Sequence, residues 1–225
     1  MASKLLDENI IKQVKELFTD LDHPVKVLFF GSNKENCEYC EETKGLLSEI
    51  VAIDDRFSME TYDIETDSDI AKQYNITKAP TTVIAAVKDD EIINYGVQYA
   101  GIPAGHEFTS LVNSMLMVSK QDSGLAPSIR EALAKIESPV NLKVFVTPTC
   151  PYCPRAVIVA HQMAIESPFV VGEMVEAMEF QELSNQFHVS GVPHTVINDG
   201  GGDVVGAVPE DHLMEEIQKV LAITV

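Results

Sequence analysis

Two closely spaced cysteine pairs are the residues of this chain best suited to chemistry. The 225 residues include four cysteines, arranged as Cys37-Glu-Tyr-Cys40 and Cys150-Pro-Tyr-Cys153. A CxxC pair can bind a metal ion, form a structural disulfide or cycle between dithiol and disulfide. Structural disulfides are typical of short, cysteine-dense secreted scaffolds, and this chain is neither short nor cysteine-rich. The choice is therefore between metal binding and redox chemistry.

The spacing of the two pairs favours redox chemistry over metal binding. In zinc ribbons and fingers the second pair follows the first by roughly 12–20 residues, because the loop folds back onto the ion. Here Cys40 and Cys150 are much farther apart. Two distant pairs could still meet around one ion, so a non-catalytic zinc-bound scaffold remains an alternative. We expect no metal.

Both pairs lie where a strand is expected to lead into a helix. The apolar runs VKVLFF and LKVFV precede them, and the segments EETKGLLSEIVAI and RAVIVAHQMAI follow with helical composition. Unpaired N–H groups and the helix dipole at such an N-terminus lower the pKa of a thiol. We therefore predict that Cys37 and Cys150 attack a substrate disulfide. Cys40 and Cys153, three residues on, then resolve the mixed disulfide.

The chain repeats itself with an offset of 113 residues. This offset relates both cysteines of the two pairs, and it also relates Pro80 to Pro193 and Asp63 to Glu176. The pattern indicates a tandem duplication. Each proline precedes an apolar strand, where a central-strand proline would be unusual. A cis X–Pro bond in a tight turn explains both, and a trans proline at an edge or turn is the alternative.

The elements that position the cysteines follow the same repeat. Each unit is expected to run β-α-β-α-β-β-α, which predicts an α/β fold of two tandem units, each a central mixed sheet flanked by helices. We place the first unit at 1–118 and the second at 128–225. The polar stretch 119–127 between them, with Gly and Pro as helix breakers, is the predicted linker. An amphipathic helix is also expected within residues 6–18.

The net charge of −19 bears on partners. Nucleic acid and anionic membranes are repelled by such a charge, so we expect neither as a partner. No apolar run reaches the roughly 18 residues that span a bilayer. Charged residues interrupt the apolar positions at the N-terminus, so we expect no signal peptide and a cytoplasmic location.

Three sequence motifs suggest a family. The turn CPYC and the later GVPHTV resemble glutaredoxins, and the layout of one unit resembles the thioredoxin fold. Two such units with a CxxC in each resemble the protein disulfide oxidoreductases of thermophilic archaea and bacteria. The segment AGIPAGHEFTSLV also resembles the N-terminal domain of the alkyl hydroperoxide reductase flavoprotein. The HEF within it carries this resemblance, and we assign it no chemistry.

The resemblance implies a function and a substrate site. It implies that Pro80 and Pro193 are cis and face the cysteines, and that the backbones of Ala79 and Val192 pair with a bound substrate strand. It implies an enzyme of the EC 1.8 type that reduces, forms or isomerises disulfides in protein substrates. A thioredoxin-reductase-type flavoenzyme would supply the electrons, and no cofactor is expected beyond the two redox-active disulfides.

Three alternatives in function remain open beside this one. A dedicated redox relay to a peroxidase such as a peroxiredoxin is the first. A glutathione-dependent glutaredoxin is the second, although the basic residues that usually hold glutathione are sparse here, with Lys34 in the first unit and Arg155 in the second. The zinc-bound scaffold is the third.

Departures from the thioredoxin pattern concern how the thiols are tuned. There is no tryptophan, and the strands before the cysteines contain no acid. Asp63 and Glu176 could act on the resolving thiol through water, or could be solvated strand ends.

The residues between and near the cysteines predict that the two halves are unequal. Glu38 places a negative charge beside the first thiolate, whereas Pro151 adds rigidity and no charge. We therefore predict that Cys150 is the more acidic and reactive thiol. His194 could approach Cys150 and hold its thiolate, and a solvent-facing position is the interpretation that we favour.

Overall fold

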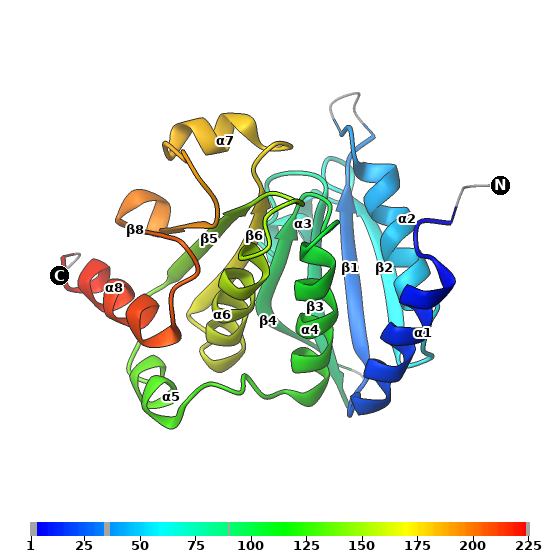
Figure 1. The fold of residues 1–225 in the computed structure, drawn as a ribbon, viewed down its shortest axis with the longest axis horizontal. Helices are drawn as coiled ribbons and strands as arrows, with labels where there is room; N and C mark the ends of the chain where they lie inside the picture. The colour runs from blue at the N-terminus through cyan, green and yellow to red at the C-terminus, as the bar shows by residue number, and fades with distance from the viewer. Residues whose placement is uncertain (1–3, 34–36, 90, 224–225) are drawn as a thin grey trace.

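The computed structural model describes residues 4–33, 37–89 and 91–223. In this part of the chain the strands form one eight-stranded sheet (Figure 1). The strands are β1 (Val25–Gly31), β2 (Phe57–Asp63), β3 (Thr81–Lys88), β4 (Glu91–Ala100), β5 (Val140–Val146), β6 (Val170–Glu176), β7 (His194–Ile197) and β8 (Gly202–Val205). The helices are α1 (Glu8–Leu17), α2 (Cys40–Val51), α3 (Ser68–Gln73), α4 (Glu107–Lys120), α5 (Pro127–Leu133), α6 (Cys153–Glu166), α7 (Gln181–Gln186) and α8 (Glu210–Ile223). Two short 3-10 helices, Phe18–Asp20 and Asn198–Gly200, are also present.

The strand order shows the duplication and how the halves join. The order is β2-β1-β3-β4-β6-β5-β7-β8, so each half contributes four neighbouring strands. In each half the first two strands are parallel and the next two are added antiparallel. Strands β4 and β6 then pair in parallel, through Val97–Ala100 and Gly172–Val175. The predicted α/β class with two tandem units is confirmed, and the joining of the two sheets into one was not predicted.

This joining brings the two cysteine turns to the same edge of the sheet. Following the pairings from β1 through β3, β4 and β6 to β5 shows that β1 and β5 run in the same direction. Each is followed by its CxxC turn, so both turns lie where these strands end (Figure 1). Four interstrand spacings of about 4.8 Å place the two strand ends roughly 20 Å apart.

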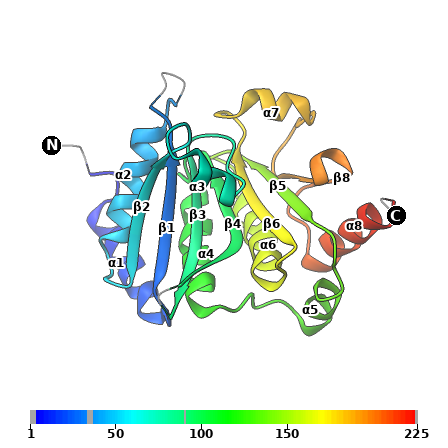
Figure 2. The same cartoon turned by 180° about the vertical axis from the view of Figure 1, so that it is seen from behind.

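Helices cover the sheet on both faces, which explains why strand β1 is almost wholly apolar. Alternate residues of β1 point to opposite faces, with Val27 and Phe29 in the larger core and Leu28 and Phe30 in a smaller one. The larger core takes residues from α1, α2, α4, α6 and α8, and α3 and α7 contribute to the two smaller clusters. Figure 2, the view from behind, shows α3 on the near side of the strands.

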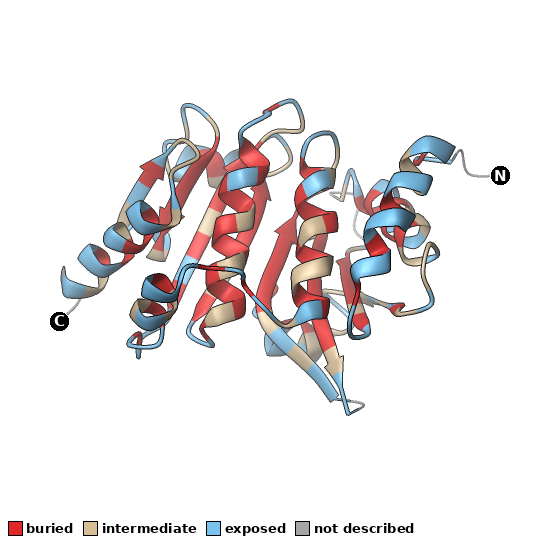
Figure 3. Ribbon diagram, turned by 60° about the horizontal axis from the view of Figure 1, so that its bottom comes forward, coloured by how far each residue is buried: buried red, intermediate tan, exposed pale blue. Residues whose placement is uncertain are grey.

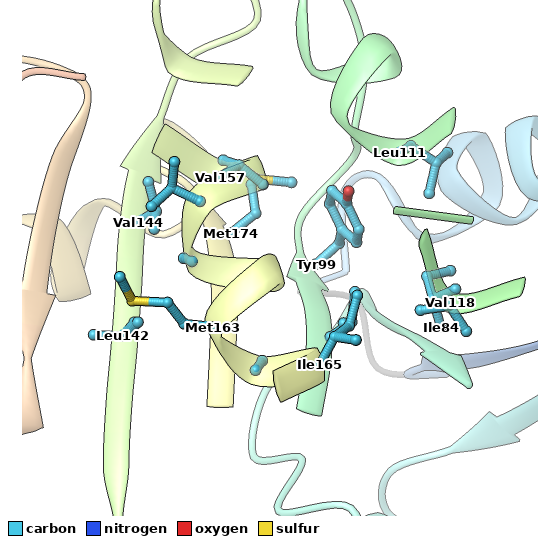
Figure 4. Packing of buried hydrophobic residues seen from close by; sticks show 14 of the residues in the cluster. Ile84, Tyr99, Leu111, Val118, Leu142, Val144, Val157, Met163, Ile165 and Met174 are labelled. Atoms are coloured by element: carbon cyan, nitrogen blue, oxygen red, sulfur yellow. The ribbon is translucent and has the colours of Figure 1, made fainter. Parts of the chain in front are cut away.

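The middle of the larger core belongs to both units. Helices α4 and α6 lie side by side on one face of the sheet (Figure 3), with α6 against β6 and β4 and α4 against β3 and β1. Figure 4 shows Tyr99 of β4 between side chains of α6 and Leu111 of α4. The Tyr99 hydroxyl donates to Ser114 Oγ. The Tyr99 ring packs edge-on against the His161 ring, with 4.9 Å between the ring centroids. The two halves therefore share a continuous interior.

Two local differences from the sequence prediction concern the region between the units. Helix α4 continues to Lys120 and α5 begins at Pro127, so the predicted linker 119–127 includes the ends of both helices. Helix α5 was not predicted, because its seven residues are too few for a clear helical period. The division of the chain at this segment stays a prediction. The helix expected near the N-terminus is present as α1.

Within the described residues, no helix combines the length and apolar character that crossing a membrane requires.

Candidate active site

Each cysteine pair lies at the start of a helix that follows the first strand of its unit. Helix α2 begins at Cys40 and α6 begins at Cys153, each with a tyrosine as N-cap residue. Both pairs are disulfide-bonded, with Cα–Cα distances of 5.4 Å for Cys37–Cys40 and 5.5 Å for Cys150–Cys153. The predicted strand-to-helix position is confirmed in both units.

Within each pair the first cysteine is the more exposed residue. Cys37 is half-buried and Cys40 is 7% exposed, whereas Cys150 is 8% exposed and Cys153 is fully buried. A substrate sulfur can therefore reach the first cysteine more readily than the second. This difference is what the assignment of attacking and resolving thiols requires.

Backbone N–H groups point at one sulfur of each pair. The N–H of Cys153 donates to Cys150 Sγ at 3.2 Å, and the N–H of Ser32 donates to Cys40 Sγ at 3.4 Å. In the second unit the donor belongs to the first turn of α6, so it would stabilise a Cys150 thiolate after reduction.

The charges around the two pairs differ in the direction that the sequence predicted. Exposed Glu38 lies within the first pair, and Glu41 and Glu42 stand in the first turn of α2. The first turn of α6 has no acidic residue and carries Arg155. Exposed Pro151 lies between the second pair of cysteines. Like charges near a thiolate raise its pKa, so these surroundings favour Cys150 as the more acidic thiol.

The two prolines share a cis peptide bond and a backbone hydrogen bond to a glycine. The Ala79–Pro80 and Val192–Pro193 peptide bonds are cis, as predicted. The carbonyl of Pro80 accepts from the N–H of Gly101 at 2.9 Å, and the carbonyl of Pro193 accepts from the N–H of Gly206 at 2.8 Å.

Two adjoining hollows reach the residues before these prolines. The larger, called the inter-unit groove below, has a volume of about 1100 Å³ and includes Glu38 and Ala79 of the first unit. The smaller, of about 380 Å³, includes Thr147 and Val192 of the second unit. Met178 and Gln181 line both. The backbone that the resemblance assigns to substrate binding is therefore accessible at both sites.

Comparison with known proteins identifies the architecture. The family described as Thioredoxin domain matches residues 140–220. A protein disulfide oxidoreductase from Aeropyrum pernix superimposes with a TM-score of 0.86 at 29% identity, over 96% of this chain and 94% of that chain. The alkylhydroperoxide reductase AhpF from Enterococcus faecalis (C503A mutant) gives a TM-score of 0.85 at 26% identity, over 94% and 99%. Each unit is a thioredoxin fold.

Curated relatives agree with this result. The alkyl hydroperoxide reductase AhpF from Pseudomonas aeruginosa is 27% identical over 202 residues, which is 90% of this chain and 35% of the relative. The Staphylococcus aureus protein of the same name is also 27% identical, over 86% of this chain and 34% of the relative. The chain thus spans about a third of the length of the curated relatives that it matches. Together with the two CxxC disulfides, these similarities support thiol–disulfide exchange.

In the first thioredoxin unit Asp63 holds a turn. Its carboxylate accepts from the N–H groups of Asn33, Glu65 and Thr66 at 2.9–3.0 Å. These bonds, that from Thr66 foremost, lower the pKa of Asp63. Asp63 also lines a pocket with Cys40, of about 220 Å³. If Asp63 acted as a base through water, its carboxylate would have to do so while accepting the hydrogen bonds of this turn. The role of Asp63 as a base stays a prediction.

Glu176 of the second thioredoxin unit is not a solvated strand end. It is 3% exposed, and burial raises the pKa of its carboxyl group. One oxygen accepts from the N–H of Glu179 at 2.6 Å, and the other has no hydrogen-bond partner among the described residues. The sequence interpretation missed this because strand β6 becomes interior only when β4 pairs with it.

His194 is buried, so the favoured solvent-facing position was wrong. It is 6% exposed, and its Nε2 lies 3.1 Å from an oxygen of Asp203 on the neighbouring strand β8. Phe145 pairs with it across the sheet. Short strands β7 and β8 fold His194 into the sheet, which a single sequence does not reveal. An effect of His194 on Cys150 stays a prediction.

Glu107 is a buried acid that the sequence interpretation left without a role. It is 1% exposed at the start of α4, and burial raises the pKa of its carboxyl group to about 7. One oxygen accepts from the Ser110 hydroxyl, and the other has no partner in the described part of the chain. The neighbouring N–H of His106 donates to the carbonyl of Pro148, two residues before Cys150. Glu107 therefore sits in the loop and helix that pack against the second CxxC turn.

In residues 4–33, 37–89 and 91–223, no three His, Cys, Asp or Glu side chains gather in a way that could hold a metal ion.

Proposed function

We propose that this protein is a thiol–disulfide oxidoreductase that reduces, forms or isomerises disulfides in other proteins. The observation that carries the proposal is the duplicated site. In both units a disulfide lies at a helix N-terminus, its first cysteine is the more exposed, and the residue before a cis proline lines an adjoining groove.

Reduction of a substrate at the second unit proceeds in two exchanges. The Cys150 thiolate attacks one sulfur of the substrate disulfide, a mixed disulfide forms, and the other substrate sulfur leaves as a thiolate that takes up a proton. Cys153 then loses its proton and attacks Cys150 Sγ. This forms the Cys150–Cys153 disulfide, found in the structure, and releases the second substrate thiol. The electron pair moves between sulfur atoms throughout, so the chemistry needs no bound cofactor.

The protein must then be reduced again by an external dithiol. We propose a thioredoxin-reductase-type flavoenzyme as the electron donor to this protein. The protein itself would act on disulfide substrates in the cytoplasm. Oxidation of a substrate dithiol is the same sequence in reverse. The direction depends on the potential of each pair relative to that of its surroundings.

The test is catalysed reduction of a protein disulfide by a small dithiol. Wild type would be compared with Cys37→Ser, Cys150→Ser and the double variant. We expect Cys150→Ser to lose most of the activity and the double variant to lose all of it. If wild type gives no catalysis and the purified protein contains stoichiometric zinc, the proposal is wrong and the pairs are metal ligands.

A relay to a peroxidase is the second candidate, and it is favoured by the similarity to the alkyl hydroperoxide reductase AhpF. A relay would transfer electrons from its reductase to one peroxiredoxin much faster than to unrelated protein disulfides. Comparing the two rates with the same reductase would separate the candidates. A glutathione-dependent activity has less support: Arg155 is exposed on α6, and Lys34 lies outside the described residues.

A further inference from the structure

Glu179 of the second unit makes a hydrogen bond to the backbone of the first. Its Oε1 accepts from the N–H of Ile102 at 2.6 Å, in the loop that follows β4. Its Oε2 is buried and has no hydrogen-bond partner among the described residues. The sequence analysis gave Glu179 no role, because the contact exists only where the two units meet.

This hydrogen bond lies one residue from the backbone that contacts the cis-proline of the first site. Ile102 follows Gly101, whose N–H donates to the carbonyl of Pro80 at 2.9 Å. A Cβ built on Gly101 would lie 2.9 Å from Glu179 Oε1 and 2.6 Å from Glu176 Cβ. Glu179 therefore packs against the backbone that holds Pro80. Ala79, on the other side of that proline, lines the inter-unit groove together with Glu179.

The duplication provides an internal comparison. The N–H of Gly206 donates to the carbonyl of Pro193, just as the N–H of Gly101 donates to that of Pro80. However, nothing lies within 4 Å of a Cβ built on Gly206. The residue that corresponds to Glu179 in the first unit is Thr66, which is exposed. Among the described residues, the first site alone therefore receives a carboxyl group from the other unit in this way, because β4 is interior whereas β8 is the edge of the sheet.

The same carboxyl group lies near Glu38, the residue after Cys37 in the first cysteine turn. Glu38, between Cys37 and Cys40, lines the inter-unit groove with Glu179. Burial raises the pKa of Glu179 to about 7, and the negative charges of Glu176 and Glu38 add to this increase. Other charged residues that line the groove are Lys78, which pairs with Glu173; Lys143, which pairs with Asp199; and exposed Glu182.

We propose that Glu179 is a positioning residue of the first unit's disulfide site, where it fixes the Gly101–Ile102 backbone behind Pro80 and sets the charge beside Glu38. This inference rests on the proposed thiol–disulfide exchange. When Glu179 ionises, its charge opposes a thiolate at Cys37, so the reactivity of the first site depends on the state of a second-unit side chain.

Two substitutions separate the two effects. Glu179→Gln keeps an oxygen that can accept from Ile102 and removes the titrating proton, whereas Glu179→Ala removes both. The pKa of Cys37 would be read from its alkylation rate against pH, in full-length protein with the other three cysteines changed to Ser. We expect Glu179→Gln to lower this pKa by about one unit. Glu182→Gln, which removes an exposed charge from the same groove, should leave it unchanged.

Substrate binding is measured separately. In protein with the second pair changed to Ser and the first pair intact, Glu179→Ala should raise KM for a protein disulfide about threefold with little change in kcat. Glu179→Gln should keep the wild-type KM. The pKa of Cys150, read with Cys150 as the remaining cysteine, should be the same with and without Glu179→Gln.

An unchanged Cys37 pKa in Glu179→Gln would overturn the inference, and so would an equal shift at Cys150. Alkylation does not require catalysis, so it decides the role of Glu179 even if wild type fails to reduce protein disulfides. In that case the proposed function fails on its own. If Glu179→Ala does not fold, Glu179→Gln still gives the answer.

Discussion

The ammonium group of Lys78 lies 2.6 Å from Oε1 of Glu173, and this ion pair joins the first redox site to the second unit. Lys78 directly precedes the cis peptide bond of Ala79 and Pro80, and Glu173 belongs to strand β6. The two side chains are 20% and 7% exposed, so the pair is largely shielded from water. It links the loop before Pro80 in one unit to a central strand of the other.

We predict that removing one partner of this pair destabilises the protein much more than removing both. Lys78→Met leaves the Glu173 carboxylate buried without its partner, at a cost of about 3–5 kcal/mol, whereas Lys78→Met with Glu173→Met costs less. Lys72→Met, which breaks an exposed pair with Asp69, is the control and should cost under about 1 kcal/mol. Urea unfolding of the four proteins measures these differences. Equal costs for the single and double variants would show that the pair does not act as a unit.

The two matched glycines should respond differently to alanine. Both have positive φ, +94° at Gly101 and +95° at Gly206, so Gly206→Ala should cost about 1 kcal/mol from backbone strain alone. Gly101→Ala also pushes a methyl group against Glu176 and Glu179, and we expect about 3 kcal/mol or more. Thermal unfolding of both variants makes the comparison. Similar losses would mean that the contact between the units relaxes easily.

His161 predicts a loss of stability in acid. It is fully buried on α6, with Nδ1 2.8 Å from Ser114 Oγ, and burial lowers its pKa to about 4. The unfolded chain takes up this proton near pH 6.5, so between pH 6.5 and 4 it binds more protons than the folded chain. The contribution of His161 to the free energy of unfolding is therefore fully present above pH 6.5. It falls by about 3 kcal/mol as the pH drops to 4.

Replacing His161 by Gln should flatten this part of the pH profile, even if the variant is less stable at pH 7. His212→Gln removes an exposed histidine and should leave the slope as in wild type. Urea unfolding between pH 7 and 4 measures both. The prediction fails if His161→Gln keeps the full acid slope.

Glu107 predicts the opposite pH dependence. Its folded pKa of about 7 lies above the ordinary value of 4.5 because of burial, so between pH 4.5 and 7 the folded chain binds more protons than the unfolded one. Its contribution therefore weakens as the pH rises, by about 3 kcal/mol in total. Glu107→Gln should gain stability relative to wild type between pH 4.5 and pH 8. Exposed Glu131→Gln is the control, and a constant difference between Glu107→Gln and wild type would refute the assignment.

The first and second cysteine pairs should differ in thiol pKa. We expect Cys150 to have a lower pKa than Cys37, because Glu38 adds a negative charge within the first pair. Glu38→Gln should lower the pKa of Cys37, and the reciprocal Pro151→Glu should raise that of Cys150, each by about half a unit to one unit. Alkylation rate against pH gives all four values. A lower pKa at Cys37 than at Cys150 in wild type would sink this prediction.

Much of each site could be predicted from the sequence because it is local. The cysteines, their strand-to-helix turns and the two cis prolines depend on residue types and spacings within one unit, and the 113-residue repeat presents each of them twice. Hydrophobic runs of strand length and helical segments after the cysteines indicated the fold class for the same reason.

Other features depend on residues far apart in the chain and were decided by the tertiary structure. Sequence periodicity cannot reveal that β4 pairs with β6, so it could not show that Glu176 is buried or that Glu179 reaches Ile102. Likewise, the environment of His194 depends on the hairpin of β7 and β8.

The sequence by itself thus determined what each half contains: a reactive cysteine pair, a helix start to activate it and a proline beside it. Only the tertiary structure decided that the halves are unequal partners in one sheet. The physical reason is that burial and electrostatic environment are set by neighbours across β4 and β6, and identical positions in the repeat meet different neighbours there.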